Sequence, residues 1–281
     1  MPDVTTAALL VTLAAAVVHA LWNQLLAGSR DPAASSAVGL LVGAVVVAPL
    51  ALVDLRWEAA AWPWVAGSVA CSVGYFVGLA AAYRRAPMGV IYPVARGSAP
   101  VLVLLGGWLA LDQDVGWYAA AGVLVVVAGI LLVRGIGPGV RPAQLLLALG
   151  VGTCIAGYTL LDAVALGHAS PIALLVVVHG VSAVARTAAL ARTSGGRRAL
   201  AGTLRGRDAW RTVATGLGIY LAYGLVLVAL TMAPAGPVSA VRETSVAVAV
   251  LLLAATGQER VTRVRLAGAV LVAAGVALVV A

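Results

Sequence analysis

The 281-residue sequence contains no lysine and little charge of either sign, since 10% of its residues are charged and 63% are hydrophobic. A soluble globular protein usually carries about 25% charged residues, so this composition excludes an ordinary soluble enzyme and a disordered protein. The two cysteines, Cys71 and Cys154, indicate neither a disulfide framework nor a metal site. No stretch of soluble composition approaches the size of a small domain, about 50 residues.

Several catalytic motifs are also missing from the sequence. It has no HExxH zinc motif, no pair of CxxC motifs, no phosphate-binding P-loop and no GxSxG nucleophile elbow. An ATP-driven pump would therefore need a separate motor subunit. We predict no enzyme activity, no cofactor and no metal site. The net charge of +8 comes from arginines in short loops, so nucleic-acid binding is not predicted either.

Apolar stretches long enough to cross a bilayer recur along the whole chain. We predict an all-α integral membrane protein with ten transmembrane helices, because lipid cannot satisfy exposed backbone groups. The only long connection runs from Arg192 to Arg211. The predicted spans are Val4–Ala27, Ala34–Val53, Trp62–Ala82, Met88–Leu111, Val115–Val133, Ala143–Leu166, Pro171–Leu190, Ala209–Met232, Pro237–Thr256 and Val264–Ala281.

The arginines between the spans predict the orientation of the chain. Those after the odd-numbered spans are Arg30, Arg84, Arg85, Arg134, Arg141, Arg192, Arg197, Arg198, Arg205, Arg207, Arg211, Arg260, Arg263 and Arg265. On the other side we count only Arg56. The positive-inside rule therefore predicts a multi-pass protein of the plasma (inner) membrane, with the Arg192–Arg211 loop cytoplasmic and both termini extracytoplasmic. The first span follows Met-Pro-Asp without basic residues, so we interpret it as an uncleaved helix.

The sequence resembles itself across its middle. The segment Ala86–Gly89 reads against Ala233–Gly236, and a pair of glycines seven residues apart occurs near the end of each half. We therefore predict two five-helix repeats, residues 1–138 and 139–281. Because five is odd, the second repeat must cross the membrane in the opposite sense. Inverted repeats are typical of secondary transporters, which bind solute near the midplane between the halves. The alternative is a gene duplication in a membrane protein that transports nothing.

Four stretches resemble a known family. The chain is similar to EamA-type members of the drug/metabolite transporter superfamily in His19–Asn23, Tyr92–Pro100, Tyr158–Asp162 and Val241–Ser245. The resemblance covers essentially the whole chain. It implies ten helices in two inverted halves and the export of amino acids, nucleotide-related metabolites or drugs. Many members are drawn with cytoplasmic termini, whereas the arginines of this chain predict the opposite.

Polar side chains inside the spans are the candidate solute contacts, because such groups are costly in a bilayer. His19, Trp22 and Asn23 are spaced three and four residues apart and share one helix face. Tyr158 and Asp162 repeat that spacing in the second half. We predict that the set lines a cavity. The alternative is that Asn23 and His19 only join helices, through hydrogen bonds that contribute about 0.6 kcal/mol each.

Arg96 and the pair Arg242 and Glu243 are the strongest of these signals. A guanidinium at the bilayer centre costs about 2.5–3.5 kcal/mol even on the lenient insertion scale. Arg96 stands between Pro93 and Pro100, so we expect its helix to be kinked or unwound there. Substrate contact and a structural role as counter-charges between helices both remain open for the two arginines.

Three tyrosines and two acids complete the candidates. Tyr75, Tyr92 and Tyr223 could contribute ring or hydroxyl contacts, or could simply pack. Asp162 and Glu243 are the acids placed well inside the bilayer, and either could bind a proton.

The inversion of the repeats also predicts which of these side chains meet. It places Asp162 with Arg242 in the outer half of the membrane, as an ion pair or water-bridged contact. His19 and Asn23 then lie beside Arg96 in the inner half, which leaves that arginine available for an anionic or zwitterionic solute.

The predicted function is a secondary transporter, an exporter of small metabolites such as amino acids or related polar solutes, working by alternating access. A proton or a counter-solute could drive it, and the sequence predicts no oligomeric state. An integral-membrane enzyme acting on lipids is one alternative, but it would need acids, histidines or metal ligands converging at one interface. A structural membrane partner that docks through the Arg192–Arg211 loop is the other.

Overall fold

A computed structural model of the chain describes residues 5–83, 88–114, 116–134, 141–256 and 262–279. In this part of the chain the secondary structure is helical, apart from one isolated β-bridge between Trp57 and Ala169. The elements are α1 (Thr6–Ala27), α2 (Pro32–Ala51), η1 (Ala59–Ala61), α3 (Trp62–Tyr83), α4 (Met88–Leu111), α5 (Trp117–Arg134), α6 (Pro142–Ala165), α7 (Pro171–Ala191), α8 (Ser194–Gly202), α9 (Arg207–Leu230), α10 (Ala235–Arg242), α11 (Thr244–Thr256) and α12 (Arg263–Val279).

Proline and capping residues fix where several helices begin. Pro32, Pro142 and Pro171 stand in the first turns of α2, α6 and α7, where a missing N–H costs nothing and the fixed φ suits a helix. Ahead of Pro32, the Asp31 carboxylate accepts a hydrogen bond of 2.9 Å from the N–H of Ala34. These residues explain why the helices start within a few residues of the predicted positions.

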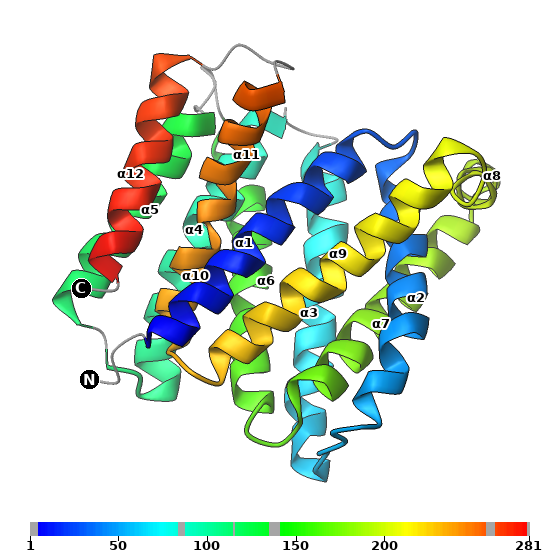
Figure 1. The fold of residues 1–281 in the computed structure, drawn as a ribbon, viewed down its shortest axis with the longest axis horizontal. Coiled ribbons are helices and arrows are strands. Elements are labelled where there is room, and N and C mark those ends of the chain that lie inside the picture. The colour runs from blue at the N-terminus through cyan, green and yellow to red at the C-terminus, as the bar shows by residue number, and fades with distance from the viewer. Residues whose placement is uncertain (1–4, 84–87, 115, 135–140, 257–261, 280–281) are drawn as a thin grey trace.

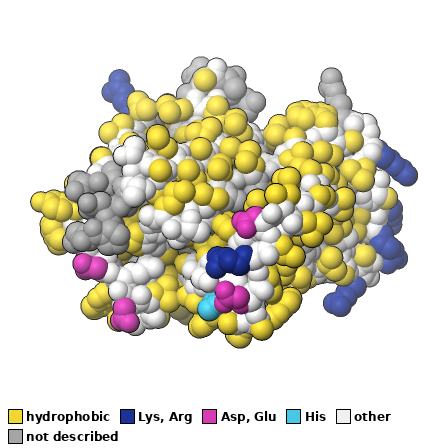
Figure 2. All heavy atoms as spheres, turned by 60° about the horizontal axis from the view of Figure 1, so that its bottom comes forward, with side chains coloured by type: hydrophobic (Ala, Val, Ile, Leu, Met, Phe, Trp, Pro, Cys, Tyr) yellow, Lys and Arg dark blue, Asp and Glu magenta, His cyan; other side chains and the backbone are white. Residues whose placement is uncertain are grey.

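Eight of the described helices are long and apolar enough to cross a membrane. They lie within Thr6–Ala27, Pro32–Ala51, Ala59–Leu79, Val94–Leu111, Pro142–Ala165, Pro171–Ala191, Asp208–Leu230 and Ala235–Leu252. The apolar helix of α5, Trp117–Val133, is shorter. Large apolar side chains such as Val45, Leu109 and Trp117 are exposed on the helices, and hydrophobic atoms cover most of the face in Figure 2. The chain is thus a multi-pass membrane protein with an apolar outer surface.

The break in a membrane helix lies in a different place from the one predicted. Helix α4 continues without interruption through residues 93, 96 and 100, so the unwinding expected around Arg96 is wrong. A proline removes one backbone hydrogen bond and can bend a helix without ending it. The interruption falls instead at Glu243, where α10 ends and α11 begins one residue later. The loop from Arg192 to Arg211 also contains a short helix, α8, that the sequence did not suggest.

The helices pack in a regular set of partners (Figure 1). Helix α1 lies against α9, α3 against α6, and α2 against both α7 and α9. Helices α5 and α12 pack along each other at one side of the molecule. Their contact is close because glycines face backbone: a Cβ added to Gly129 would lie 2.7 Å from the carbonyl oxygen of Gly268. The same holds two helical turns earlier on α5, where a Cβ on Gly122 would lie 2.6 Å from the carbonyl oxygen of Gly275.

An arginine secures the end of a helix at each end of the bundle. Arg56, between α2 and η1, donates hydrogen bonds of 2.8, 3.0 and 3.2 Å to the carbonyl oxygens of Leu166, Gly167 and Ala169 after α6. At the opposite end, Arg211 of α9 donates to the carbonyl oxygen of Gly28 after α1. Cations are favourable at helix C-termini because of the helix dipole, so both arginines stabilise the loops they join.

Candidate functional site

A cavity of about 760 Å³ lies among the membrane helices, with walls from both halves of the chain. Most of the side chains predicted to contact solute line it: His19, Trp22, Asn23, Tyr75, Arg96, Tyr158, Tyr223 and Arg242. Its lining also includes Arg30 and Asp31, in the connection between α1 and α2. Arg30 is largely exposed, so the cavity extends to the end of the bundle where α1 ends.

The remaining predicted residues lie elsewhere. Asp162 and Glu243 are completely buried and are not among the cavity-lining residues. The side chain of Tyr92 lies outside the described part of the structure. Each acid instead contacts side chains that line the cavity, Asp162 through Tyr223 and Glu243 through the two arginines.

Arg96 on α4 contacts His19 on α1, as the sequence predicted. The guanidinium Nη2 lies 2.6 Å from the imidazole Nε2. Because an arginine only donates, Nε2 must accept and the histidine proton is on Nδ1. The edge of the His19 ring meets Trp22, with ring centroids 4.7 Å apart. Asn23 lines the same wall but donates its amide to the carbonyl oxygen of His19, 2.7 Å away.

Glu243 lies between two arginines. Its Oε1 is 3.4 Å from Nη1 of Arg96 and 3.8 Å from Nε of Arg242. Both distances exceed those of charge-assisted hydrogen bonds, and neither carboxylate oxygen has a hydrogen-bond partner among the described residues. One glutamate at the helix break thus lies between two arginines from different halves of the chain, and its single negative charge balances one of their two positive charges.

The predicted ion pair between Asp162 and Arg242 does not form in the structure. Asp162 on α6 accepts a hydrogen bond from the hydroxyl of Tyr223 on α9, while Arg242 pairs with Glu243. The prediction failed because it located both residues in the outer half of the membrane without knowing which helices pack together. Arg96 is not a free arginine either, since it shares Glu243 with Arg242.

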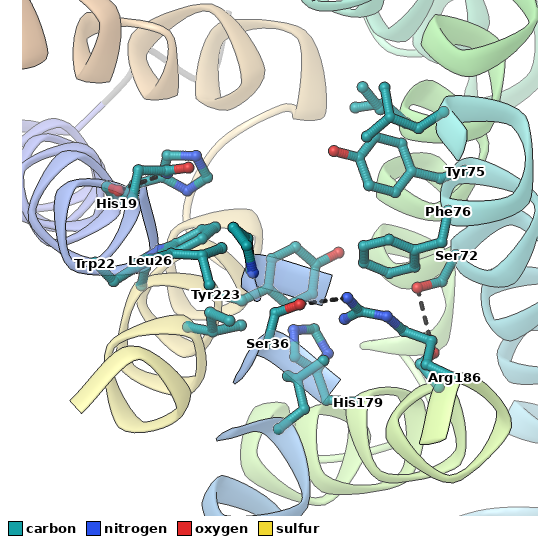
Figure 3. A pocket seen from close by; sticks show the side chains of 18 of the residues that line it. His19, Trp22, Leu26, Ser36, Ser72, Tyr75, Phe76, His179, Arg186 and Tyr223 are labelled. Atoms are coloured by element: carbon teal, nitrogen blue, oxygen red, sulfur yellow. Dashed lines mark hydrogen bonds between the residues drawn. The ribbon is translucent and has the colours of Figure 1, made fainter. Parts of the chain in front are cut away.

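The sequence reasoning missed an arginine in the cavity wall. Arg186 on α7 donates a hydrogen bond of 2.6 Å to Oγ of Ser36 on α2. Its guanidinium carbon lies 3.6 Å from the ring centroid of Phe76 on α3, which is a cation–π contact (Figure 3). Ser182 and His179, one and two turns earlier on α7, face the same cavity.

A signal for Arg186 was available in the sequence. It lies inside the predicted span Pro171–Leu190, so the argument applied to Arg96 holds for it equally. With His179 and Ser182 it forms a spacing of three and four residues, which places all three on one helix face. Only arginines in the connections between spans were counted for the orientation, and Arg186 is not one of them.

Comparisons with known proteins identify the family. The model of the EamA-like transporter family matches residues 5–135 and 143–281. One relative, "Uncharacterized transporter YwfM" of Bacillus subtilis (strain 168), is 30% identical over 165 residues. That alignment covers 57% of this chain and 55% of the relative, so it spans only about half of that protein. A solved structure described as "Crystal structure of protein" has a TM-score of 0.75 at 18% identity, over 96% of this chain and 97% of that chain, and so shares the fold.

The family match agrees with the apolar helices and with the cavity between them. It covers nearly the entire chain in two successive stretches, which coincide with the two halves of the sequence. This chain belongs to the EamA-like transporter family.

Proposed function

We propose that the protein is a secondary transporter that exports a small polar metabolite across the plasma membrane by alternating access. The cavity carries this proposal, because polar side chains from both halves of the chain converge on it within an apolar bundle. Arg96 comes from the first half, Arg186 and Tyr223 from the second. Polar groups at such depth are costly, and in membrane proteins they commonly mark solute or ion paths.

Several features support ten spans in two inverted repeats. In both halves a glycine follows the first span and a proline stands four residues later: Gly28 with Pro32, and Gly167 with Pro171. The packing partners also exchange between the halves, since α3 lies on α6 as α9 lies on α1. Under this reading α10 and α11 together are the ninth span, and α5 and α12 are the fifth and tenth.

The side of the membrane toward which the cavity extends supports an inward-facing conformation. Its lining reaches Arg30, on the side of the membrane that carries most of the arginines. By the positive-inside rule that side is cytoplasmic, with both termini on the opposite side. A cavity open to the cytoplasm would load solute there, as export requires. Two of the residues that bound the cavity, Ala15 and Val226, belong to an apolar cluster with Val238.

Neither alternative is favoured by this arrangement. An enzyme acting on lipids would present its polar groups at an interface, whereas His19, Arg96 and Tyr223 line an internal cavity. A purely structural partner has no use for a cavity of this size. The driving gradient, a proton or a counter-solute, can be distinguished by experiment.

Uptake into proteoliposomes tests the proposal. Purified protein would be reconstituted and supplied with labelled amino acids, nucleosides and organic acids, with either a pH gradient or an excess of unlabelled solute inside. We expect saturable uptake of at least one solute, and its loss in Arg96→Ala and Asp162→Ala variants that still insert. Arg192→Ala is the matched control, because Arg192 is exposed and outside the cavity. Full transport by both the Arg96 and the Asp162 variant would contradict the assigned solute path.

A further inference from the structure

The described cavity wall contains one arginine that no acid neutralises. Arg186 donates to the hydroxyl of Ser36 and lies over the ring of Phe76, and no acid among the described residues is within salt-bridge distance of it. A hydroxyl and an aromatic face stabilise a guanidinium only in part, and they orient it without removing its charge. Figure 3 shows this group projecting from α7 between Ser36 and Phe76.

The acids near the cavity already interact with other side chains. Glu243 is held between two arginines, and Asp162 accepts from Tyr223; both are completely buried. Asp31 is the acid in the lining, and it lies at the mouth, where its carboxylate caps α2. The interior wall therefore presents positive charge and no exposed carboxylate among the described residues.

The lining also has an unmet hydrogen-bond donor. The indole Nε1–H of Trp22 is buried without a hydrogen-bond partner in the described structure. Together with the guanidinium of Arg186, this indole gives the wall N–H donors for whatever occupies the cavity. Buried donors without partners are costly, so an occupant that supplies acceptor oxygens is favoured.

Beyond the serines, the cavity that Arg186 faces has apolar and aromatic side chains in its wall. Phe76, Leu26, Ile219 and the rings of His179 and Tyr223 line the same cavity, with the last two stacked at 4.8 Å between centroids. Such a surface suits a hydrocarbon or aromatic body better than a second charge.

We infer that Arg186, steered by Ser36 and Phe76, is the subsite that binds the carboxylate of a monoanionic amphipathic solute, whose apolar part lies against the aromatic wall. A guanidinium fork matches the two oxygens of a carboxylate. The inference rests on the proposed function in that it names the substrate class of the same cavity. It moves the anion site from Arg96, where the sequence placed it, to α7.

The inference separates organic anions from zwitterions and cations. A free amino acid would bring an ammonium group for which the interior wall has no available carboxylate. A neutral or cationic analogue would leave the charge of Arg186 unmatched. The solute class is therefore distinguished by one functional group on an otherwise constant body.

Three probes that share a phenethyl body test it: 3-phenylpropionate, 3-phenylpropionamide and phenethylamine, titrated calorimetrically into the protein in lipid nanodiscs at neutral pH. We expect the carboxylate to bind at least about tenfold more tightly than the other two, as for a hydrogen-bonded charge pair. Arg186→Gln should abolish that preference, and Arg186→Lys should keep part of it. Arg192→Gln, on an exposed arginine beyond the cavity, should retain the full preference.

Two outcomes would overturn the assignment. The first is that the wild type binds the three probes with similar affinity, or binds none of them at millimolar concentration. The second is an unchanged carboxylate preference in Arg186→Gln. Should Arg186→Gln fail to fold, Ser36→Ala carries the test, with a several-fold loss of affinity for 3-phenylpropionate alone. Uptake experiments distinguish the two proposals. Saturable transport without any Arg186-dependent anion preference removes the subsite but keeps the transporter. Arg186-dependent binding without transport of any solute keeps the subsite but removes the transporter.

Discussion

Glu243 Oε1 lies 3.4 Å from Nη1 of Arg96, so the residue that interrupts the helix of one half holds the buried arginine of the other. Helix α4 and the α10–α11 pair approach each other at this point. Removing a buried acid that pairs with two arginines therefore has a high electrostatic cost.

We predict that Glu243→Gln lowers the free energy of unfolding by about 3–5 kcal/mol, because two buried guanidinium groups lose their counter-charge. Chemical unfolding in mixed micelles measures the change. The double variant Glu243→Gln with Arg96→Gln should recover part of the loss. Glu58→Gln is the matched control: Glu58 pairs with His168 at 2.9 Å on the surface, and its loss should cost about 0–1 kcal/mol. Equal effects of the two single variants would contradict the buried bridge.

The hydrogen bond from Tyr223 to Asp162 gives a second prediction. Tyr223→Phe removes the donor that a fully buried carboxyl group depends on, and should destabilise the protein by about 1.5–3 kcal/mol. Tyr118→Phe provides the comparison, because the Tyr118 side chain on α5 is exposed. Thermal unfolding of both variants in the same detergent measures the difference. A shift no larger for Tyr223→Phe than for Tyr118→Phe would show that Asp162 does not need this hydroxyl.

The glycine contact between α5 and α12 predicts sensitivity to a single methyl group. Gly129→Ala places a Cβ 2.7 Å from the backbone oxygen of Gly268, which forces the helices apart. Overpacking of this kind costs about 1–3 kcal/mol. Gly150→Ala on α6 adds the same methyl where nothing lies within 4 Å, so its effect should be near zero or slightly stabilising. Comparable melting temperatures for the two variants would mean that the helix pair is loosely packed.

The orientation proposed from the arginines can be tested by labelling in intact cells. In a background with Cys71 and Cys154 replaced, Gly195→Cys on α8 should resist a membrane-impermeant thiol reagent until the cells are broken. Glu58→Cys, exposed at the other end of the bundle, should react at once. Reaction of Gly195→Cys in sealed cells would reverse the assignment and place the termini in the cytoplasm.

The sequence predicted the helices well because their signals are local. A span is bounded by where its apolar run ends, and Pro32 and Pro171 mark such points explicitly. The cavity side chains were found for a related reason: a polar group is conspicuous in an apolar run, as for His19 and Arg96.

The partners of those side chains were harder to predict, because they depend on which helices meet. Asp162 and Arg242 could pair by depth, yet α6 brings Asp162 to Tyr223 while the break at Glu243 supplies the acid for Arg242. The break itself has no local mark in the sequence, since no glycine or proline stands within four residues of Glu243. It is set by tertiary contacts with α4, which one sequence does not display.

The two arginines at the helix ends are unequal. Arg56 makes three bonds to carbonyl oxygens after α6, where Glu58 and His168 add an ion pair; Arg211 makes one bond to Gly28, beside a bridge of 3.3 Å between Arg30 and Asp208. Exposed pairs such as the latter contribute little. In the proposed cycle, the cavity reaches Arg30 while the contact between Arg211 and Gly28 is intact, whereas opening the other end would have to break the bonds around Gly167. Without solute, the resting population would favour the conformation whose cavity reaches Arg30, and a solute bound there would have to provide the difference needed to open the other side.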